Sequence, residues 1–197
     1  DEYITKTTSE RVSTSNTRKT NLIKIKLKKG IIEIEGENLT GSIKDRAVYQ
    51  MLIDDYESGR INKDTIIIEA TSGNTGISLA ALGKYFGNKI IIVMPISASL
   101  ERRNLILSYG AELVLVEGGM QECNLKAIEL QKSLQNSIIL GQFEHPSNVK
   151  AHILSTGPEI FDTVENIRYL FAGIGSGGTI TGLAKYIYMH NIDCALI

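Results

Sequence analysis

The chain alternates between short apolar runs and longer segments in which apolar residues recur with helical spacing. The apolar runs are rich in Ile, Val and Leu, as is typical of buried strands: Thr65–Glu69, Lys89–Met94, Glu112–Val116, Ser137–Leu140 and Tyr169–Ala172. The helical segments are Asp45–Ser58, Thr75–Phe86, Leu100–Tyr109, Gln121–Leu134 and Gly178–Tyr188, and Asp193–Ile197 resembles the opening of one more strand. Strands and helices that alternate through short connections predict an α/β fold with parallel sheets.

The first predicted helix has an apolar face and a defined stop. Its apolar residues recur on one side of the helix, at Val48, Met51, Leu52 and Tyr56. It ends at Gly59, a residue type that commonly terminates helices. The acidic residues Asp54, Asp55 and Glu57 are expected to form a solvated face of this helix and not an acid pair.

Composition limits the classes of partner. The 197 residues suffice for a hydrophobic core, and 21 basic residues nearly cancel 22 acidic ones, which leaves a net charge of −1. Nothing in this balance favours a nucleic acid or a membrane surface as a partner. No apolar run approaches the ~20 residues that span a bilayer, and the N-terminus shows no signal pattern, so we expect a cytoplasmic protein. The polar residues 1–20 are expected to form a loosely docked arm, and Cys123 and Cys194 are not expected to form a disulfide.

Lys44 stands where a predicted helix begins, directly after a tight turn formed by Gly41 and Ser42. The helix N-terminus adds positive potential, which favours the neutral amine over the ammonium. The neutral amine is the form that reacts with a carbonyl group to give a Schiff base. Taken by itself, a lysine in the first turn of a helix is more often a solvated surface residue.

Two further loops follow predicted strands and open predicted helices. Residues Thr71–Gly76 present several backbone N–H groups, hydroxyls and one amide around a single point, which suits a carboxylate. The alternative is an ordinary helix start capped by Ser72 or Asn74. Residues Gly173–Thr179 could hold a phosphate on backbone N–H groups, or could belong to a dinucleotide site, since they match its glycine spacing.

Taken in order, these motifs resemble those of the fold type II pyridoxal 5′-phosphate (PLP) enzymes, whose fold is tryptophan synthase β-like. The likeness runs from about Asn21 to the end and is closest to the cysteine synthases, or O-acetylserine sulfhydrylases. The segments that carry it are Gly41–Arg46 as the cofactor-lysine motif, Thr71–Gly76 as the substrate loop, Gln142–Asn148 with Thr156–Ile160, and Gly175–Thr179 as the phosphate loop.

The resemblance implies a role for each residue. Lys44 would carry PLP as a Schiff base and move the α-proton of the substrate, and Asn74 would bind the oxygen on the cofactor ring. The amino-acid carboxylate would be held by Thr71, Ser72, Thr75 and Gln142. The cofactor phosphate would be held by Gly175, Ser176, Gly177, Gly178 and Thr179. No metal site is expected, because the three histidines lack ligand spacing.

The resemblance also implies two parallel-sheet α/β domains and a homodimer. Residues 40–147 would form a smaller, mobile substrate domain. Residues 1–39 and 148–197 would form a larger domain that holds the cofactor phosphate. Enzymes of this family continue well past the point that matches Ile197, so their C-terminal part is expected to be missing from this chain.

The implied reaction is PLP-dependent β-replacement on a serine derivative, first of all the synthesis of cysteine from O-acetylserine and sulfide. The same residues could serve a cysteine desulfhydrase, a serine or threonine dehydratase, or an enzyme that forms cystathionine. A catalytically impaired fragment of such an enzyme is a further alternative. A nucleotide-binding module built on the glycine spacing of residues 173–178 is the last one.

Overall fold

A computed structural model describes residues 5–6, 23–27 and 30–197, with side chains from residue 35 onward. It divides into two units, Asp1–Ile43 and Lys44–Ile197. In the first unit, β1 (Thr5–Lys6), β2 (Ile23–Leu27) and β3 (Gly30–Ile34) form an antiparallel sheet, followed by the 3₁₀ turn η1 (Glu35–Glu37). These strands are absent from the predicted elements, although Ile and Lys alternate in β2 as in a strand with one apolar face. Apart from β1, the arm predicted for residues 1–20 lies outside the described residues.

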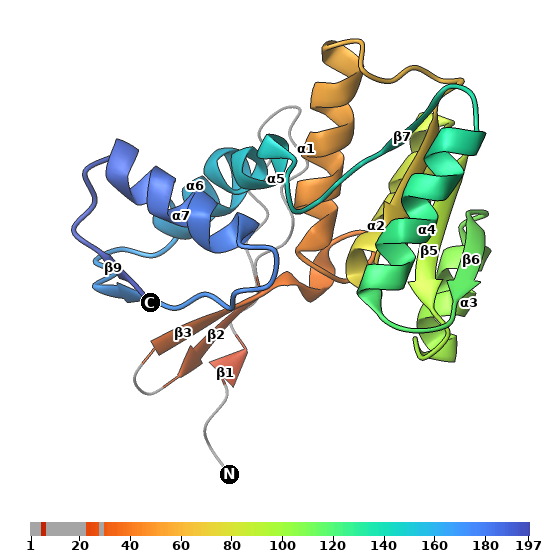
Figure 1. The fold of residues 1–197 in the computed structure, drawn as a ribbon. Coiled ribbons are helices and arrows are strands. Elements are labelled where there is room, and N and C mark those ends of the chain that lie inside the picture. Colours follow the sequence, from red (N-terminus) through yellow and green to blue (C-terminus); the bar gives the residue numbers. More distant parts are fainter. Residues whose placement is uncertain (1–4, 7–22, 28–29) are drawn as a thin grey trace. The chain divides into compact units, whose positions relative to one another are not determined.

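A parallel sheet forms the centre of the second unit. Its strands are β4 (Ile66–Ala70), β5 (Ile90–Pro95), β6 (Glu112–Val116) and β7 (Ser137–Ile139), in the order β6-β5-β4-β7. All three pairings are parallel, which confirms the predicted fold class (Figure 1). The expectation that all strands are buried is wrong for β6, whose Glu112 and Leu115 are exposed, because β6 forms an edge of the sheet.

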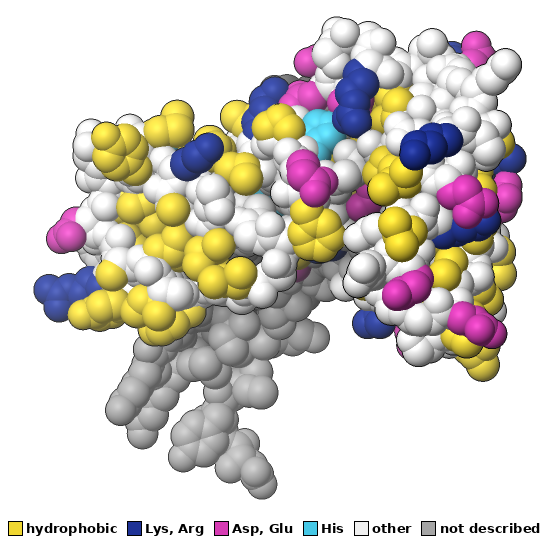
Figure 2. Space-filling view, viewed as in Figure 1, with side chains coloured by type: hydrophobic (Ala, Val, Ile, Leu, Met, Phe, Trp, Pro, Cys, Tyr) yellow, Lys and Arg dark blue, Asp and Glu magenta, His cyan; other side chains and the backbone are white. Residues whose placement is uncertain are grey.

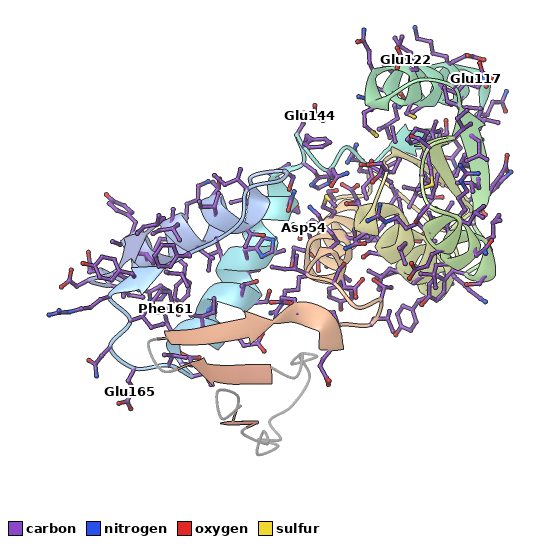
Figure 3. The ribbon with its side chains drawn as sticks, turned by 90° about the horizontal axis from the view of Figure 1, so that it is seen from below. Asp54, Glu117, Glu122, Glu144, Phe161 and Glu165 are labelled. Atoms are coloured by element: carbon purple, nitrogen blue, oxygen red, sulfur yellow. The ribbon has the colours of Figure 1, made fainter. Side chains whose placement is uncertain are left out.

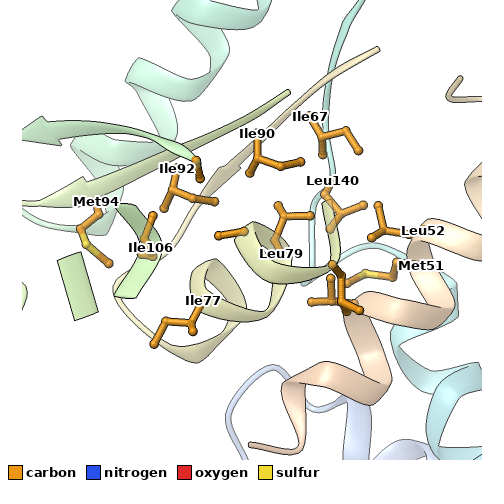
Figure 4. Close-up of a cluster of buried hydrophobic side chains, with 14 of the residues drawn as sticks. Met51, Leu52, Ile67, Ile77, Leu79, Ile90, Ile92, Met94, Ile106 and Leu140 are labelled. Atoms are coloured by element: carbon orange, nitrogen blue, oxygen red, sulfur yellow. The ribbon is translucent and has the colours of Figure 1, made fainter. Parts of the chain in front are cut away.

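Helices cover both faces of this sheet. Alternate residues of β4 and β5 point to opposite sides, as the two-residue period of a strand requires. Ile67, Ile90 and Ile92 pack with α1 (Lys44–Glu57), α2 (Asn74–Phe86) and α3 (Leu100–Ser108) in the larger core (Figure 4). Ile68, Ile91 and Val93 pack with Cys123 and Ala127 of α4 (Met120–Ser133) in the smaller core on the other face.

The predicted helices agree closely with the observed ones, including their ends. Gly87 directly follows α2, and Gly59 and Gly110 lie two residues past the ends of α1 and α3; their φ values are 86°, 73° and 89°. This left-handed conformation suits glycine, which has no Cβ to clash. The predicted apolar face of α1 is confirmed as well, because Val48, Met51 and Leu52 are all buried.

The rest of the second unit is mostly helical. It contains α5 (Pro146–Ala151), the π-helical segment η2 (His152–Thr156), α6 (Gly157–Phe161), α7 (Gly178–Met189) and a parallel pair of short strands, β8 (Tyr169–Leu170) and β9 (Ala195–Leu196). The elements α5, η2 and α6 are absent from the predicted ones. Figure 1 shows α1 between this group and the four-stranded sheet, and α1 contacts both α2 and α5.

The strand predicted at 169–172 is shorter and more exposed than expected. Tyr169 is 64% exposed, so the expectation of a buried strand is wrong there. Large apolar side chains gather on the surface over α7, β8 and β9 (Figure 2): Tyr169, Phe171, Ile174, Tyr188 and Met189. No helix within residues 30–197 combines the length and the apolarity needed to cross a bilayer. The division into domains at residues 40 and 147 stays a prediction.

Candidate active site

The carboxyl ends of β4 and β7 meet where the order of the strands reverses. The chain leaves β4 through α2 and reaches β5 on one side, whereas the neighbour on the other side, β7, is reached through α4. Open α/β sheets bind ligands at such a reversal, outside the carboxyl ends of the strands. The predicted substrate loop follows β4, and Gln142 follows β7, so both parts of the predicted carboxylate site lie at this reversal.

A hydrogen bond joins the two parts of the predicted carboxylate site. The Thr75 hydroxyl donates to Gln142 Oε1 at 2.7 Å, and both residues are buried. Thr71 is also buried, and its hydroxyl oxygen accepts a bond from the Gly73 N–H at 3.2 Å. Ser72 and Asn74 are exposed.

The start of α2 excludes the simpler interpretation of this loop. The N-cap of α2 is Gly73, and neither Ser72 nor Asn74 caps the helix through its side chain. Capping therefore does not account for the polar residues in the loop. The exposed hydroxyl of Ser72 and the exposed amide of Asn74 lie at the N-terminus of α2, where helix N–H groups favour an anion.

Glu69 is a buried carboxylate that the sequence does not single out. Glu69 lies near the end of β4, and its side chain is 2% exposed. Its Oε2 accepts a hydrogen bond from the Gly141 N–H at 2.8 Å, and its Oε1 accepts one from the Gln142 N–H at 3.3 Å. Burial raises the pKa of Glu69 to about 7; the backbone donors oppose this shift, and the charge of Glu144 adds to it. Glu69 therefore holds the turn that carries Gln142.

The structure brings Lys44 to the predicted phosphate loop. Lys44 begins α1, and its Nζ donates to Ser176 Oγ at 3.3 Å across 132 positions of sequence. Burial lowers the pKa of Lys44 below its ordinary value, and the negative charge of Glu69 acts in the opposite direction. The expected direction of this shift is confirmed, although burial is its main cause, where the sequence suggested the helix N-terminus.

The phosphate loop is shaped by glycines at the start of α7. Gly177 is the N-cap, in the left-handed conformation with a φ of 81°. A Cβ atom on Gly178 would lie 2.1 Å from Asn148 Oδ1, so no larger residue fits without a shift. Gly175 is exposed, and Thr179 Oγ1 lies 3.3 Å from Nε2 of the buried His152. This helix start offers backbone N–H groups and two hydroxyls to an anion.

Asn148 connects these parts and is missing from the predicted site. Its Nδ2 donates to Gln142 O at 2.7 Å and to Ser176 Oγ at 3.0 Å. Hydrogen bonds thus link Thr75, Gln142, Asn148, Ser176 and Lys44 in one continuous series. Asn148 ends the segment Gln142–Asn148 that resembles cysteine synthases, and His152 lies between that segment and Thr156–Ile160; this resemblance is the signal that could have pointed to both residues.

Asp55 corrects the expectation of a solvated acidic face on α1. It is 3% exposed, pairs with Arg60 at 2.8 Å and lies 3.1 Å from Nε2 of His145. The neighbouring Asp54, labelled in Figure 3, accepts from the Ser147 hydroxyl and pairs with Lys150 of α5. The segment from β7 to α5 lies against α1, so these acids join the helix of Lys44 to the helix of Asn148.

The groups assembled here fit PLP. An amine with a lowered pKa suits an aldehyde, and the α7 N-terminus with Ser176 suits a phosphate. The loop after β4, with Gln142, offers neutral donors to a carboxylate. Among the described residues no cluster of three or more His, Cys, Asp or Glu side chains could hold a metal ion.

A family model described as pyridoxal-phosphate dependent enzyme matches residues 15–197. The chain belongs to this family. Membership confirms the predicted cofactor and the fold type, and it favours PLP over a nucleotide as the ligand of the glycine loop.

Known members of the family resemble this chain over most of its length. A cysteine synthase from a Flavobacterium species is 48% identical over 157 residues, which cover 78% of this chain and 51% of that protein. A hydrogen sulfide-producing enzyme from Fusobacterium nucleatum is 38% identical with a TM-score of 0.80, over 84% of this chain and 56% of the other. An O-acetylserine dependent cystathionine beta-synthase from Helicobacter pylori is 34% identical with a TM-score of 0.79, over 84% and 55% of the two chains. The chain spans about half the length of these relatives.

Proposed function

We propose that the complete protein performs PLP-dependent β-replacement on a serine derivative and makes cysteine from O-acetylserine and sulfide. The observation that carries the proposal is the hydrogen bond from Lys44 Nζ to Ser176 Oγ, which joins an amine with a lowered pKa to the glycine-rich loop that opens α7. The name of the relative with 48% identity, cysteine synthase, supports this choice of reaction.

The proposed roles follow from the contacts of each residue. When bound, PLP withdraws electrons from the α-carbon of the substrate and makes its proton removable. Lys44 would hold the cofactor through Nζ and carry the proton that leaves and returns to Cα. Its lowered pKa increases the fraction of unprotonated amine that can accept this proton near neutral pH. Gly175, Ser176, Gly177, Gly178 and Thr179 would hold the phosphate, and Asn74 the ring oxygen.

The carboxylate of the amino acid would lie between the loop after β4 and the segment after β7. Thr71, Ser72, Thr75 and Gln142 would hold it there. The bond from the Thr75 hydroxyl to Gln142 Oε1 fixes these two residues relative to each other before substrate binds, and it leaves the Gln142 Nε2 group and the Thr75 backbone N–H as donors. Such preorganisation lowers the entropic cost of bringing the Cα–H bond to the base. The net reaction breaks the Cβ–O bond of O-acetylserine, releases acetate and forms a Cβ–S bond.

Two related reactions are alternatives with specific support. The Fusobacterium nucleatum structure is named a hydrogen sulfide-producing enzyme, and the Helicobacter pylori structure an O-acetylserine dependent cystathionine beta-synthase. Release of sulfide from cysteine and formation of cystathionine use the same class of amino-acid substrate. A serine or threonine dehydratase and a catalytically impaired protein stay as further alternatives.

A panel of substrates tests the choice of reaction. The full-length protein, loaded with PLP, is assayed for cysteine from O-acetylserine and sulfide, for cystathionine from O-acetylserine and homocysteine, for sulfide from cysteine, and for pyruvate from serine. We expect the largest kcat/KM for cysteine formation. A larger kcat/KM for another pair would assign that reaction, and binding of PLP with no turnover of any pair would indicate the impaired protein.

We also propose an assembly, a cellular location and a domain motion for the protein. The homodimer and the mobile substrate domain of residues 40–147 are supported by the family resemblance alone. A cytoplasmic location is supported by the free thiols of Cys123 and Cys194. Light scattering on the purified full-length protein tests the dimer, because it measures the mass in solution directly.

A further inference from the structure

Asn148 makes contacts that a purely structural asparagine does not need. It is 3% exposed and lies in α5, between the turn that carries Gln142 and the phosphate loop. Its Nδ2 has two acceptors, Gln142 O and Ser176 Oγ, whereas its Oδ1 is buried with no hydrogen-bond partner. A buried carbonyl oxygen without a partner costs stability, so a position that keeps one calls for an explanation.

The orientation of this amide is fixed by its neighbours. If Oδ1 and Nδ2 exchanged places, Oδ1 would face the carbonyl oxygen of Gln142, and two acceptors would oppose each other. The amide group therefore presents its N–H groups to both Gln142 and Ser176. Gly178 packs directly against the other edge of the amide, where a Cβ atom would lie 2.1 Å from Oδ1.

The contact with Asn148 determines what the Ser176 hydroxyl can do. An amide Nδ2 only donates, so Ser176 Oγ must be the acceptor in this bond. The oxygen also receives Lys44 Nζ at 3.3 Å and, more weakly, the Gly178 N–H at 3.5 Å. With its lone pairs occupied by donors, the hydroxyl keeps its own proton for an anion at the start of α7.

We propose that Asn148 is a positioning residue of the phosphate loop, which turns the Ser176 hydroxyl into a donor for the cofactor phosphate and ties this loop to Gln142. The inference rests on the proposed binding of PLP and deepens it. Asn148 itself does not have to touch the cofactor. Its effect should therefore depend on the phosphate group of the ligand and not on the pyridine ring.

Replacement by aspartate tests this dependence. In Asn148→Asp the carboxylate would accept the Ser176 proton and place a negative charge beside the phosphate. Asn148→Ala removes the donor without adding a charge, and it also removes the unpartnered oxygen. It therefore provides a second test if the Asn148→Asp protein fails to fold. A matched control is Asn88→Asp, because Asn88 is likewise buried and donates through Nδ2 to two acceptors, the carbonyl oxygens of Asn62 and Thr65, away from this loop.

The readout is the ratio of two dissociation constants, for PLP and for pyridoxal, which lacks the phosphate. The full-length protein is stripped of cofactor and titrated with each ligand by absorbance. We expect Asn148→Asp to weaken PLP binding about tenfold or more relative to pyridoxal, because the charge-assisted bond from the Ser176 hydroxyl to the phosphate is lost. Asn148→Ala should change the ratio in the same direction but less, because it adds no negative charge. Asn88→Asp should leave the ratio unchanged.

Two results would overturn the inference. One is an Asn148→Asp protein that binds PLP as the wild type does, and the other is an equal loss of affinity for both ligands, which would indicate general damage to the fold. The proposed function fails in a different way, namely if the wild-type protein itself binds neither PLP nor pyridoxal. The failure of one can thus be told from the failure of the other.

Discussion

At the scale of single residues, Glu69 sets an unusual electrostatic condition for the site. Its carboxylate is buried beside the Gln142 turn and receives two backbone N–H groups there. Those bonds favour the ionised form, but burial disfavours it more strongly, and the pKa is raised to about 7. Glu69 therefore titrates near neutral pH at the base of the predicted carboxylate site.

The titration of Glu69 predicts how stability depends on pH. Its pKa is about 7 in the folded protein and 4.5 for an ordinary glutamate, so between these values the folded state binds more protons than the unfolded state. The free energy of unfolding should therefore fall as the pH rises from about 4.5 to 7, by up to roughly 3 kcal/mol from this group, and level off above.

Glu69→Gln should remove this dependence, because the amide does not titrate. Midpoints of urea unfolding, measured between about pH 5 and 8, should show a flatter profile than the wild type. Replacing the exposed Glu117 with glutamine serves as the control and should leave the slope as it is. The same slope in Glu69→Gln and in the wild type would show that another group titrates.

The site residues that the sequence indicates are those that stand in a short motif typical of their expected role. Lys44 at a helix start and Thr75 in a polar loop are recognisable locally. Glu69 and Asn148 are not, because their partners lie 72 positions away at Gly141 and 28 positions away at Ser176. The burial of Asp55 could not be foreseen for the same reason, since it depends on His145, 90 positions further along the chain.

At the scale of elements, the long helices could be placed from sequence because each carries a periodic apolar face and most end at a glycine. The short elements α5, η2 and α6 could not. They span five or six residues each, which is fewer than two helical turns. Such a segment is too short for a helical repeat of apolar residues to be recognised. These same elements hold Asn148 and His152 against the start of α7.

The start of α7 gives the prediction that belongs to this scale. Gly178→Ala should lower the affinity for PLP about tenfold or more, because a Cβ atom there forces Asn148 or the loop to move. Gly173→Ala is the matched control, since a Cβ atom at that position meets nothing within 4 Å. Titration of the cofactor-free full-length variants with PLP measures both. Equal affinity in the two variants would contradict the role of close packing at Gly178.

At the scale of the whole molecule, the parallel sheet and its helices follow from the alternation of apolar runs and periodic segments. The position of the site follows from topology, because β4 and β7 carry their loops to one reversal of strand order. Sequence alone could not foresee the packing of the segment after β7 against α1. That packing, through Asp54 and Asp55, holds the helix of Lys44 beside α5.

The central claim is that Lys44 holds PLP, and covalent trapping tests it directly. The full-length protein, loaded with PLP, is reduced with borohydride, digested and examined by mass spectrometry. The account predicts the added mass on the peptide that contains Lys44, and a Lys44→Ala protein that lacks both the label and the visible absorbance of the bound cofactor. A label on another lysine, or an unchanged absorbance in Lys44→Ala, would contradict it.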